Sequence, residues 1–197
     1  MAEEIPKEER EEILERVEKR AAAYDYEFSG CGQMVLLALQ QEFDLPGRSA
    51  VFKAATFTGR GTSGVGGICG ALVGGIMAIS LASGRERIED SIYPDPEVRD
   101  EISGFPKSLE TIRKFYKRFL QELGSWQCRE LQVRLLGRSY DPENLEESER
   151  FSKEGGRERC AELVGKADTD SAKGNQGAVG SFRLFLPSSL NCLLSPG

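Results

Sequence analysis

The chain has 197 residues, of which 39% are hydrophobic and 29% are charged, and its formal net charge is −6. A chain of this length and composition can bury the core of one domain. Its acidic balance gives no basic footprint for nucleic acid. The sequence contains no histidine, which excludes Ser-His-Asp and Cys-His catalysis and His-containing metal sites.

The start of the chain predicts a cytoplasmic protein. Met1-Ala2-Glu3-Glu4 contains two acidic residues, and the apolar segment of a signal peptide does not follow it. Structural disulfides are rare in the cytosol. The five cysteines are therefore expected to be reduced, catalytic or metal-bound.

Hydrophobic periodicity predicts helices along most of the chain. Ser29 is the predicted N-cap of the second helix, after a break in the chain at residues 24–30. Strand patterns are weak, so the sequence predicts an all-α fold with a single compact multi-helix domain. The predicted helices cover residues 6–23, 31–43, 49–55, 67–82, 106–123 and 126–136, and a last helix holds Cys160 near its start.

The predicted domain ends where the character of the sequence changes. Residues 1–167 are assigned to the helical domain. Residues 168–197 are rich in Ser, Gly and Asn at first and show no amphipathic period, so they are predicted to form a disordered tail. An abrupt change of this kind can also arise from a frameshift in the gene, which resequencing would test. Cys192 lies in this tail and is given no role.

The stretch between Arg60 and Arg85 carries no charge. Its length and its glycine spacing would suit a membrane helix. However, its first part is polar, and the strongly apolar part, residues 68–82, is too short to span a bilayer comfortably. We therefore expect a buried helix that packs closely against a neighbour through its glycine face.

Four cysteines are predicted at or near helix starts: Cys31, Cys69, Cys128 and Cys160. A thiol in the first turn of a helix faces unpaired N–H groups and the positive end of the helix dipole, which favours the thiolate. If the four starts converge, the thiols would form one site with lowered pKa values. Such a site suits dithiol chemistry, and it equally suits a metal or an iron–sulfur cluster.

The pattern of these cysteines resembles that of the C_GCAxxG_C_C family of redox-active proteins. The most specific match is the run GICGALVGG around Cys69, and Gly32 stands where members often carry alanine. The resemblance covers about residues 21–167. It implies a small cytosolic protein whose four cysteines transfer electrons, as dithiols or around a metal centre. The matching segments are residues 30–39, 58–61, 67–75, 81–85, 128–131 and 160–164.

We predict a redox protein in which two of the four cysteines cycle between dithiol and disulfide, with Cys69 as the attacking thiolate and Cys31 as its partner. Arg60, in the loop before Cys69, is a candidate for stabilising thiolates. The alternative is an electron-transfer protein without thiol exchange, in which Cys31, Cys69, Cys128 and Cys160 bind a metal or an iron–sulfur cluster. A third hypothesis is a structural helical module with buried thiols.

The predicted partner is another redox protein, and neither nucleic acid nor a membrane is expected to bind. Apolar and glycine-rich helix faces are consistent with a homodimer. The glycine-rich loop at residues 59–67 lacks the GxxxxGK[ST] pattern of a P-loop and no strand precedes it. A nucleotide-binding site is therefore not predicted there.

Overall fold

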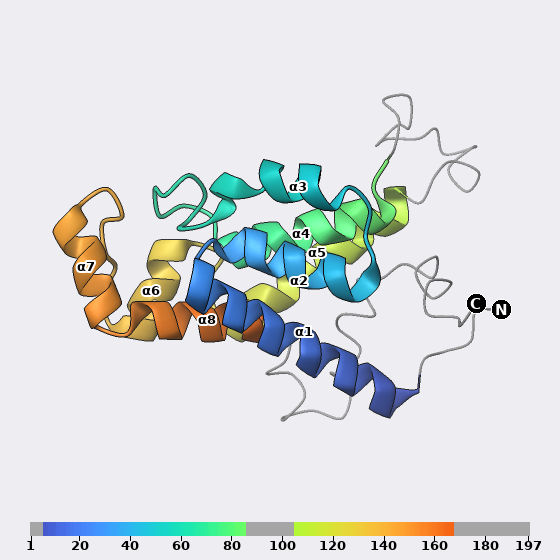
Figure 1. The fold of residues 1–197 in the computed structure, drawn as a ribbon, viewed down its shortest axis with the longest axis horizontal. Helices are drawn as coiled ribbons and strands as arrows, with labels where there is room; N and C mark the ends of the chain where they lie inside the picture. Colours follow the sequence, from blue (N-terminus) through green and yellow to red (C-terminus); the bar gives the residue numbers. More distant parts are fainter. Residues whose placement is uncertain (1–5, 86–104, 168–197) are drawn as a thin grey trace.

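A computed structural model describes residues 6–85 and 105–167. The described residues form eight α-helices and one short 3₁₀ helix (Figure 1), and their only β-structure is an isolated bridge between Ile68 and Gln127. The all-α prediction is thus confirmed. The tail at residues 168–197 lies outside the described residues. The elements are α1 (Lys7–Phe28), α2 (Cys31–Phe43), α3 (Arg48–Ala54), η1 (Thr56–Thr58), α4 (Gly70–Ser83), α5 (Phe105–Leu123), α6 (Cys128–Leu136), α7 (Leu145–Lys153) and α8 (Gly156–Lys166).

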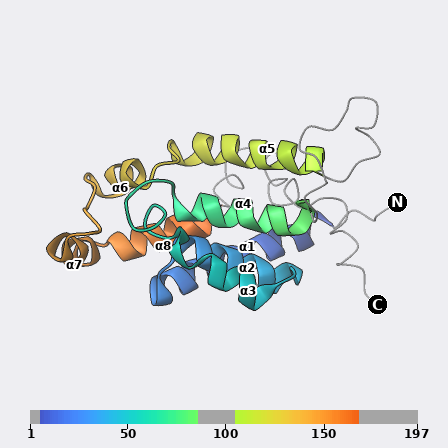
Figure 2. The same ribbon diagram turned by 90° about the horizontal axis from the view of Figure 1, so that it is seen from above.

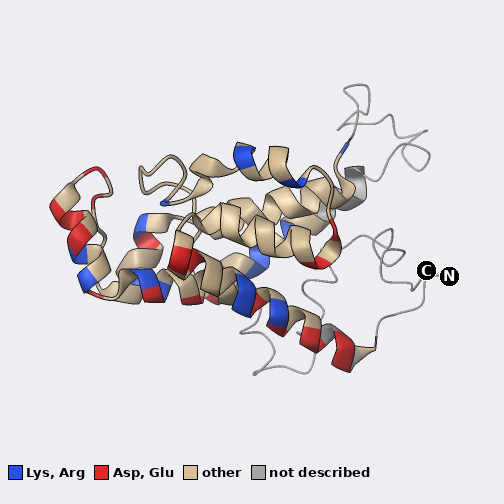
Figure 3. Ribbon diagram, viewed as in Figure 1, with Lys and Arg blue, Asp and Glu red and all other residues tan. Residues whose placement is uncertain are grey.

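The helices form a layered bundle with a cluster of short helices at one end. Helix α2 contacts both α1 and α4, and α5 packs on α4 (Figure 2). Helix α4 carries no charged residue, whereas α1 and α7 carry many (Figure 3). Helix α8 packs against α1 and contacts α6 and α7. This arrangement places α6, α7 and α8 beside the end of α1 and the start of α2.

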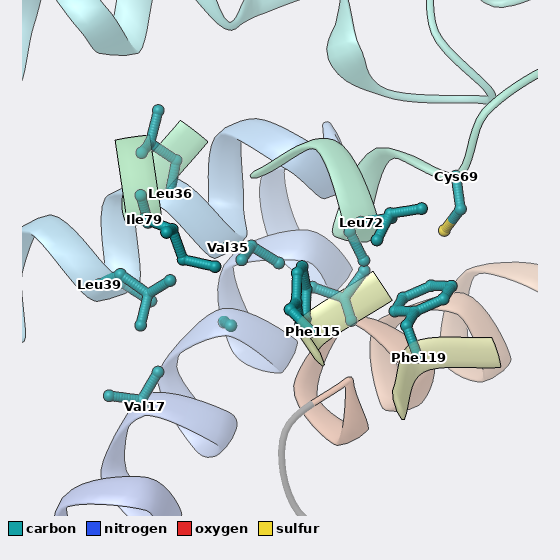
Figure 4. Close-up of a cluster of buried hydrophobic side chains, with 14 of the residues drawn as sticks. Val17, Val35, Leu36, Leu39, Cys69, Leu72, Ile79, Phe115 and Phe119 are labelled. Atoms are coloured by element: carbon teal, nitrogen blue, oxygen red, sulfur yellow. The ribbon is translucent and has the colours of Figure 1, made fainter. Parts of the chain in front are cut away.

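One hydrophobic core joins the four long helices. Leu36 and Leu39 of α2 are fully buried, and Phe119 of α5 is 2% exposed. Val17 from α1 and Ile79 from α4 complete the same cluster (Figure 4). Because burial of one large apolar side chain stabilises the fold by about 1.5–3 kcal/mol, these contacts fix the relative positions of α1, α2, α4 and α5.

Helix α1 is longer than predicted. The break expected at residues 24–30 is absent up to Phe28, and Ser29 ends α1 as its C-cap instead of starting α2. The N-cap of α2 is Gly30, whose φ of 111° is accessible mainly to glycine. Aromatic residues disfavour helix only weakly, so tertiary packing can override that preference. The short link between the helices brings the end of α1 beside the start of α2.

Helices α2 and α4 cross with their backbones almost in contact. A Cβ atom added to Gly74 would lie 2.4 Å from the carbonyl oxygen of Gly32, and one added to Gly70 would lie 2.6 Å from that of Thr58. The predicted close packing through a glycine face is confirmed. Helix α4 begins at Gly70, three residues later than predicted. Among the described helices, none is both long enough and apolar enough to cross a membrane.

The last part of the domain contains two helices, and the predicted last helix, which holds Cys160, corresponds to the second of them. Helix α7 begins after Asn144, whose side chain accepts hydrogen bonds from the N–H groups of Glu146 and Glu147. The chain then turns at Gly155, which has a φ of 81° and is the N-cap of α8. Consequently Cys160 lies in the middle of α8 and not near the start of the helix.

Candidate thiol site

The described cysteines occupy two kinds of position. Cys31 and Cys128 are the first residues of α2 and α6, and Cys69 is the N-cap of α4. Cys160 lies inside α8. The prediction that all four stand at helix N-termini is therefore not confirmed. All four are free thiols in the structure.

Three of the four thiols line one pocket of about 440 Å³. Cys31, Cys128 and Cys160 belong to its wall, together with residues from the end of α1, the loop before α4, and α6, α7 and α8. Cys69 does not line the pocket. It is 6% exposed and lies in the hydrophobic core near Leu72 and Phe119 (Figure 4). Three thiols therefore line the pocket, and the fourth is buried in the core.

A short backbone ladder holds Cys69 and Cys128 in register. The N–H of Cys69 donates to the carbonyl of Trp126 (2.8 Å), and the N–H of Cys128 donates to that of Gly67 (2.7 Å). These bonds flank the antiparallel bridge of Ile68 with Gln127, so Cys69 and Cys128 lie on the same face of the ladder. Diagonal neighbours of this kind have Cα atoms about 7–8 Å apart. A small movement would bring them within the roughly 4.4–6.8 Å of a disulfide.

Polar groups lie close to two of the thiols and affect their pKa values. Cys69 is the N-cap of α4 but makes no side-chain capping hydrogen bond, and the nearby backbone N–H groups of Ala71 and Leu72 lower the pKa of its thiol. The thiol of Cys31 lies beside Asp25 and the backbone of Arg60, and it lowers the pKa of Asp25 while the charge of Asp25 raises that of Cys31.

Cys128 has a polar neighbour that a second residue orients. Gln132 lies one turn later on α6, and its Nε2 donates to the sulfur of Cys128 over 3.8 Å. The Oε1 of Gln132 accepts the backbone N–H of Tyr140 at 3.0 Å. Because Tyr140 is 4% exposed and packs edge-on against Phe151, this contact fixes which end of the amide faces the thiol.

Burial opposes the thiolate at all four positions. It raises the pKa of Cys69 to about 12, although two backbone N–H groups favour the charged form. It also raises the pKa values of Cys31 and Cys160 well above the ordinary range of a thiol. The prediction that helix starts would lower the thiol pKa values is therefore wrong. The cost of removing a thiolate from water exceeds the stabilisation by the helix N-terminus.

Cys128 differs from the other three thiols. Burial raises its pKa as well, but the guanidinium groups of Arg129 and Arg60 both oppose this rise. A thiolate at Cys128 would in turn raise the pKa values of Cys69 and Cys160. A second charged sulfur in the cluster is thus opposed by the first, and the nearby positive charges make Cys128 the thiol whose ionisation is least opposed.

Asp25 is a buried carboxyl group in the wall of the pocket, and the sequence analysis did not single it out. It is 6% exposed, and its Oδ1 has no hydrogen-bond partner among the described residues. Burial raises its pKa from an ordinary 3.8 to about 6, against the opposing effects of the Cys31 thiol and the charge of Arg157. In the sequence, the feature that could have drawn attention to Asp25 is an acidic residue between two tyrosines, six positions before Cys31.

The raised pKa of Asp25 makes stability depend on pH. The folded protein holds this proton more tightly than the unfolded chain, so the contribution is full below the unfolded pKa of 3.8 and is lost as the pH rises through about 6. The loss amounts to about 3 kcal/mol. We expect the Asp25→Asn variant to lack this pH-dependent loss of stability, because asparagine does not ionise. Urea unfolding measures the free energy of unfolding of both proteins near pH 4 and near pH 7. Between these two pH values the wild type should lose more stability than the variant. An equal change in both proteins would contradict the expectation.

The loop before α4 has an unusual backbone. Every residue from 60 to 64 has a positive φ, and three of these residues, Arg60, Thr62 and Ser63, are not glycine. Hydrogen bonds from Gly66 N–H to the Arg60 carbonyl and from Gly67 N–H to the Gly61 carbonyl close the loop. Non-glycine residues in this region cost about 1–3 kcal/mol each and cluster at functional sites. Here the strained loop places Arg60 in the pocket wall.

The thiol cluster does not form a ready-made metal site. Four thiolates would suit zinc or an iron–sulfur cluster by their chemistry. Yet among residues 6–85 and 105–167, no three Cys, Asp or Glu side chains are grouped so that they could hold a metal ion. Binding of a metal by this donor set would require side chains to move.

The fold and the site define a helical protein with a cluster of thiols around and behind one pocket. A family model described as "Putative redox-active protein (C_GCAxxG_C_C)" matches residues 29–170. The chain belongs to this family, which supports a general redox role and confirms the resemblance seen in the sequence. No curated protein and no solved structure matches the chain.

Proposed function

We propose that the protein is a dithiol–disulfide redox protein that uses Cys31, Cys69, Cys128 and Cys160. The observation that carries the proposal is the gathering of three thiols in the wall of one pocket, with the fourth held directly behind by the backbone ladder. Membership in a redox-active family supports the same reaction class. Its partner protein, its assembly as a homodimer and its cytoplasmic location stay predictions.

Cys128 is the best candidate for the attacking thiol. It lines the pocket, it receives a hydrogen bond from Gln132, and two arginines favour its thiolate. Cys69 was the predicted attacking residue, but its burial away from the pocket suits the role of a second thiol better. An attacking sulfur must approach the disulfide in line with the bond to be broken, so access matters as much as charge.

The reaction proceeds in two exchange steps. The thiolate of Cys128 attacks one sulfur of a substrate disulfide, forms a mixed disulfide and releases the other sulfur as a thiolate. A second protein thiol then attacks the sulfur of Cys128 and releases the rest of the substrate. The protein loses two electrons and two protons, and the substrate disulfide becomes two thiols. Cys69 and Cys160, which both interact with Cys128, are the candidates for the second thiol.

The alternative function is electron transfer through a metal or an iron–sulfur cluster bound by the same four cysteines. The clustering of four thiols favours it, because soft metals prefer thiolate ligands. The donor atoms are not arranged for one ion in the described residues, and for that reason we place this function second.

One experiment on anaerobically purified protein distinguishes the two functions. We expect four reactive thiols in residues 1–167 after unfolding, little bound metal or acid-labile sulfide, and the loss of two thiols on treatment with a mild disulfide oxidant. Mass spectrometry of the oxidised protein would identify the pair. Stoichiometric iron with sulfide, or stoichiometric zinc, would instead establish the metal function. Loss of no thiols before unfolding would leave the cysteines as structural residues.

A further inference from the structure

We infer that the substrate of this pocket is a small-molecule disulfide that carries carboxylate groups, recognised by Arg60. The inference rests on the proposed dithiol function and specifies its substrate. Arg60 and the three thiols of Cys31, Cys128 and Cys160 line the same pocket. A molecule bound there can therefore touch the guanidinium group and a reactive sulfur at once.

The form of the pocket favours a small molecule. Its volume of about 440 Å³ lies within the range of ligand sites, roughly 300–1,000 Å³. The thiols face elements that surround them on several sides, among them α7 and α8. Aromatic side chains of Phe28, Tyr140 and Phe151 supply apolar wall. A disulfide in a folded partner would have to insert a loop to reach these sulfur atoms.

Arg60 supplies the charge that selects the substrate. Its side chain forms no hydrogen bond or ion pair with another side chain in the described part of the chain. Its guanidinium nevertheless acts on two of the thiols, because it opposes the rise in the pKa of both Cys128 and Cys160. An available guanidinium beside the reactive sulfur is a strong ligand for a carboxylate.

The pocket wall carries two arginines, and Arg60 is the one whose charge acts on the thiols of Cys128 and Cys160. Arg157 donates to the carbonyl of Tyr26 at 2.7 Å, and its charge acts on buried Asp25. Glu27 and Asp141 are exposed at the wall, as Arg60 is, and neither is among the charges that shift the pKa of Cys128. The field close to Cys128 is therefore dominated by Arg60 and Arg129.

The test compares three small disulfides as oxidants of the reduced protein: dithiodipropionate with two carboxylates, cystamine with two ammonium groups, and neutral hydroxyethyl disulfide. Mass spectrometry follows the protein, and each rate constant is divided by that of a free neutral cysteine derivative with the same disulfide. We expect the carboxylate compound to exceed cystamine by about tenfold, the size of one charge-assisted hydrogen bond.

The variants separate recognition from thiol reactivity. Arg60→Ala should remove the preference for the carboxylate disulfide over cystamine, and Arg60→Lys should keep part of this preference. Both substitutions leave a non-glycine residue at the same positive φ, so backbone strain is matched. Arg48→Ala, at an arginine that bonds Asp44 and Gln40 instead of the pocket, should keep the full preference.

Two outcomes would overturn the inference while leaving the dithiol function intact. The first is equal normalised rates with all three disulfides, and the second is a preference that survives Arg60→Ala. If none of the three disulfides oxidises the reduced protein, the proposed function itself fails, and the inference fails with it.

Discussion

Replacing Cys128 by serine should abolish thiol–disulfide exchange and leave the fold unchanged. The serine hydroxyl is a poor nucleophile toward disulfides at neutral pH, so the rate should fall by more than about 100-fold. The fold should persist because the ladder uses the backbone N–H of residue 128, which donates to Gly67. Exchange kinetics with a small disulfide measure the loss, and circular dichroism with thermal unfolding checks the fold.

The matched control for this variant is Cys192→Ser, the same chemical change at a cysteine outside the predicted domain. It should retain the wild-type rate. Cys69→Ser should still form the mixed disulfide at Cys128 and then stall if Cys69 is the second thiol. An exchange rate that survives Cys128→Ser but disappears with Cys69→Ser would restore Cys69 as the attacking residue.

The second large effect is expected at the crossing of α2 and α4. Alanine at position 74 would place its Cβ 2.4 Å from the carbonyl oxygen of Gly32 and 3.0 Å from two further backbone atoms of that residue. Backbone atoms cannot move aside as a side-chain end can. The clash should outweigh the roughly 1 kcal/mol gain in helix propensity and lower the free energy of unfolding by about 2–4 kcal/mol.

Urea unfolding of Gly74→Ala measures this loss directly. Ser80→Ala is the control on the same helix, because Ser80 is exposed and its hydroxyl group donates to the carbonyl of Ile76 within the helix. Its stability should stay within about 0.5 kcal/mol of wild type. Since Gly32 follows Cys31 directly, Gly74→Ala should also disturb the pocket. A variant as stable as wild type would show that the two helices can separate freely.

The helices were predictable from local sequence to different degrees. The apolar faces at residues 31–43 and 106–123 predicted α2 and α5 to within one residue, because a period near 3.6 is a strong signal over several turns. The end of α1 was misjudged, because propensity is weak beside packing. Gly155 divides α7 from α8 by a positive φ, and glycine within a helical region is compatible with either continuation or a break.

For the site, the sequence predicted which cysteines belong to it but not their surroundings. The four cysteines and the glycines around Cys69 identified the family, since those residues are read directly from the chain. Their pKa values were predicted in the wrong direction, because local position at a helix start suggested stabilised thiolates. Burial depends on which helices cover the thiols. Asp25 and Gln132 were not predicted, because the burial of Asp25 beside Arg157 and the contact of Gln132 with Tyr140 depend on how the chain folds.

The sequence by itself determined that this is an all-helical protein with a four-cysteine redox motif, because periodicity and residue identity are local properties. The tertiary structure alone decided that Cys31, Cys128 and Cys160 share a pocket while Cys69 lies in the core. It also decided that Arg60 lies beside the thiols. These relations arise from the packing of α6, α7 and α8 at the end of α1, which no local pattern encodes.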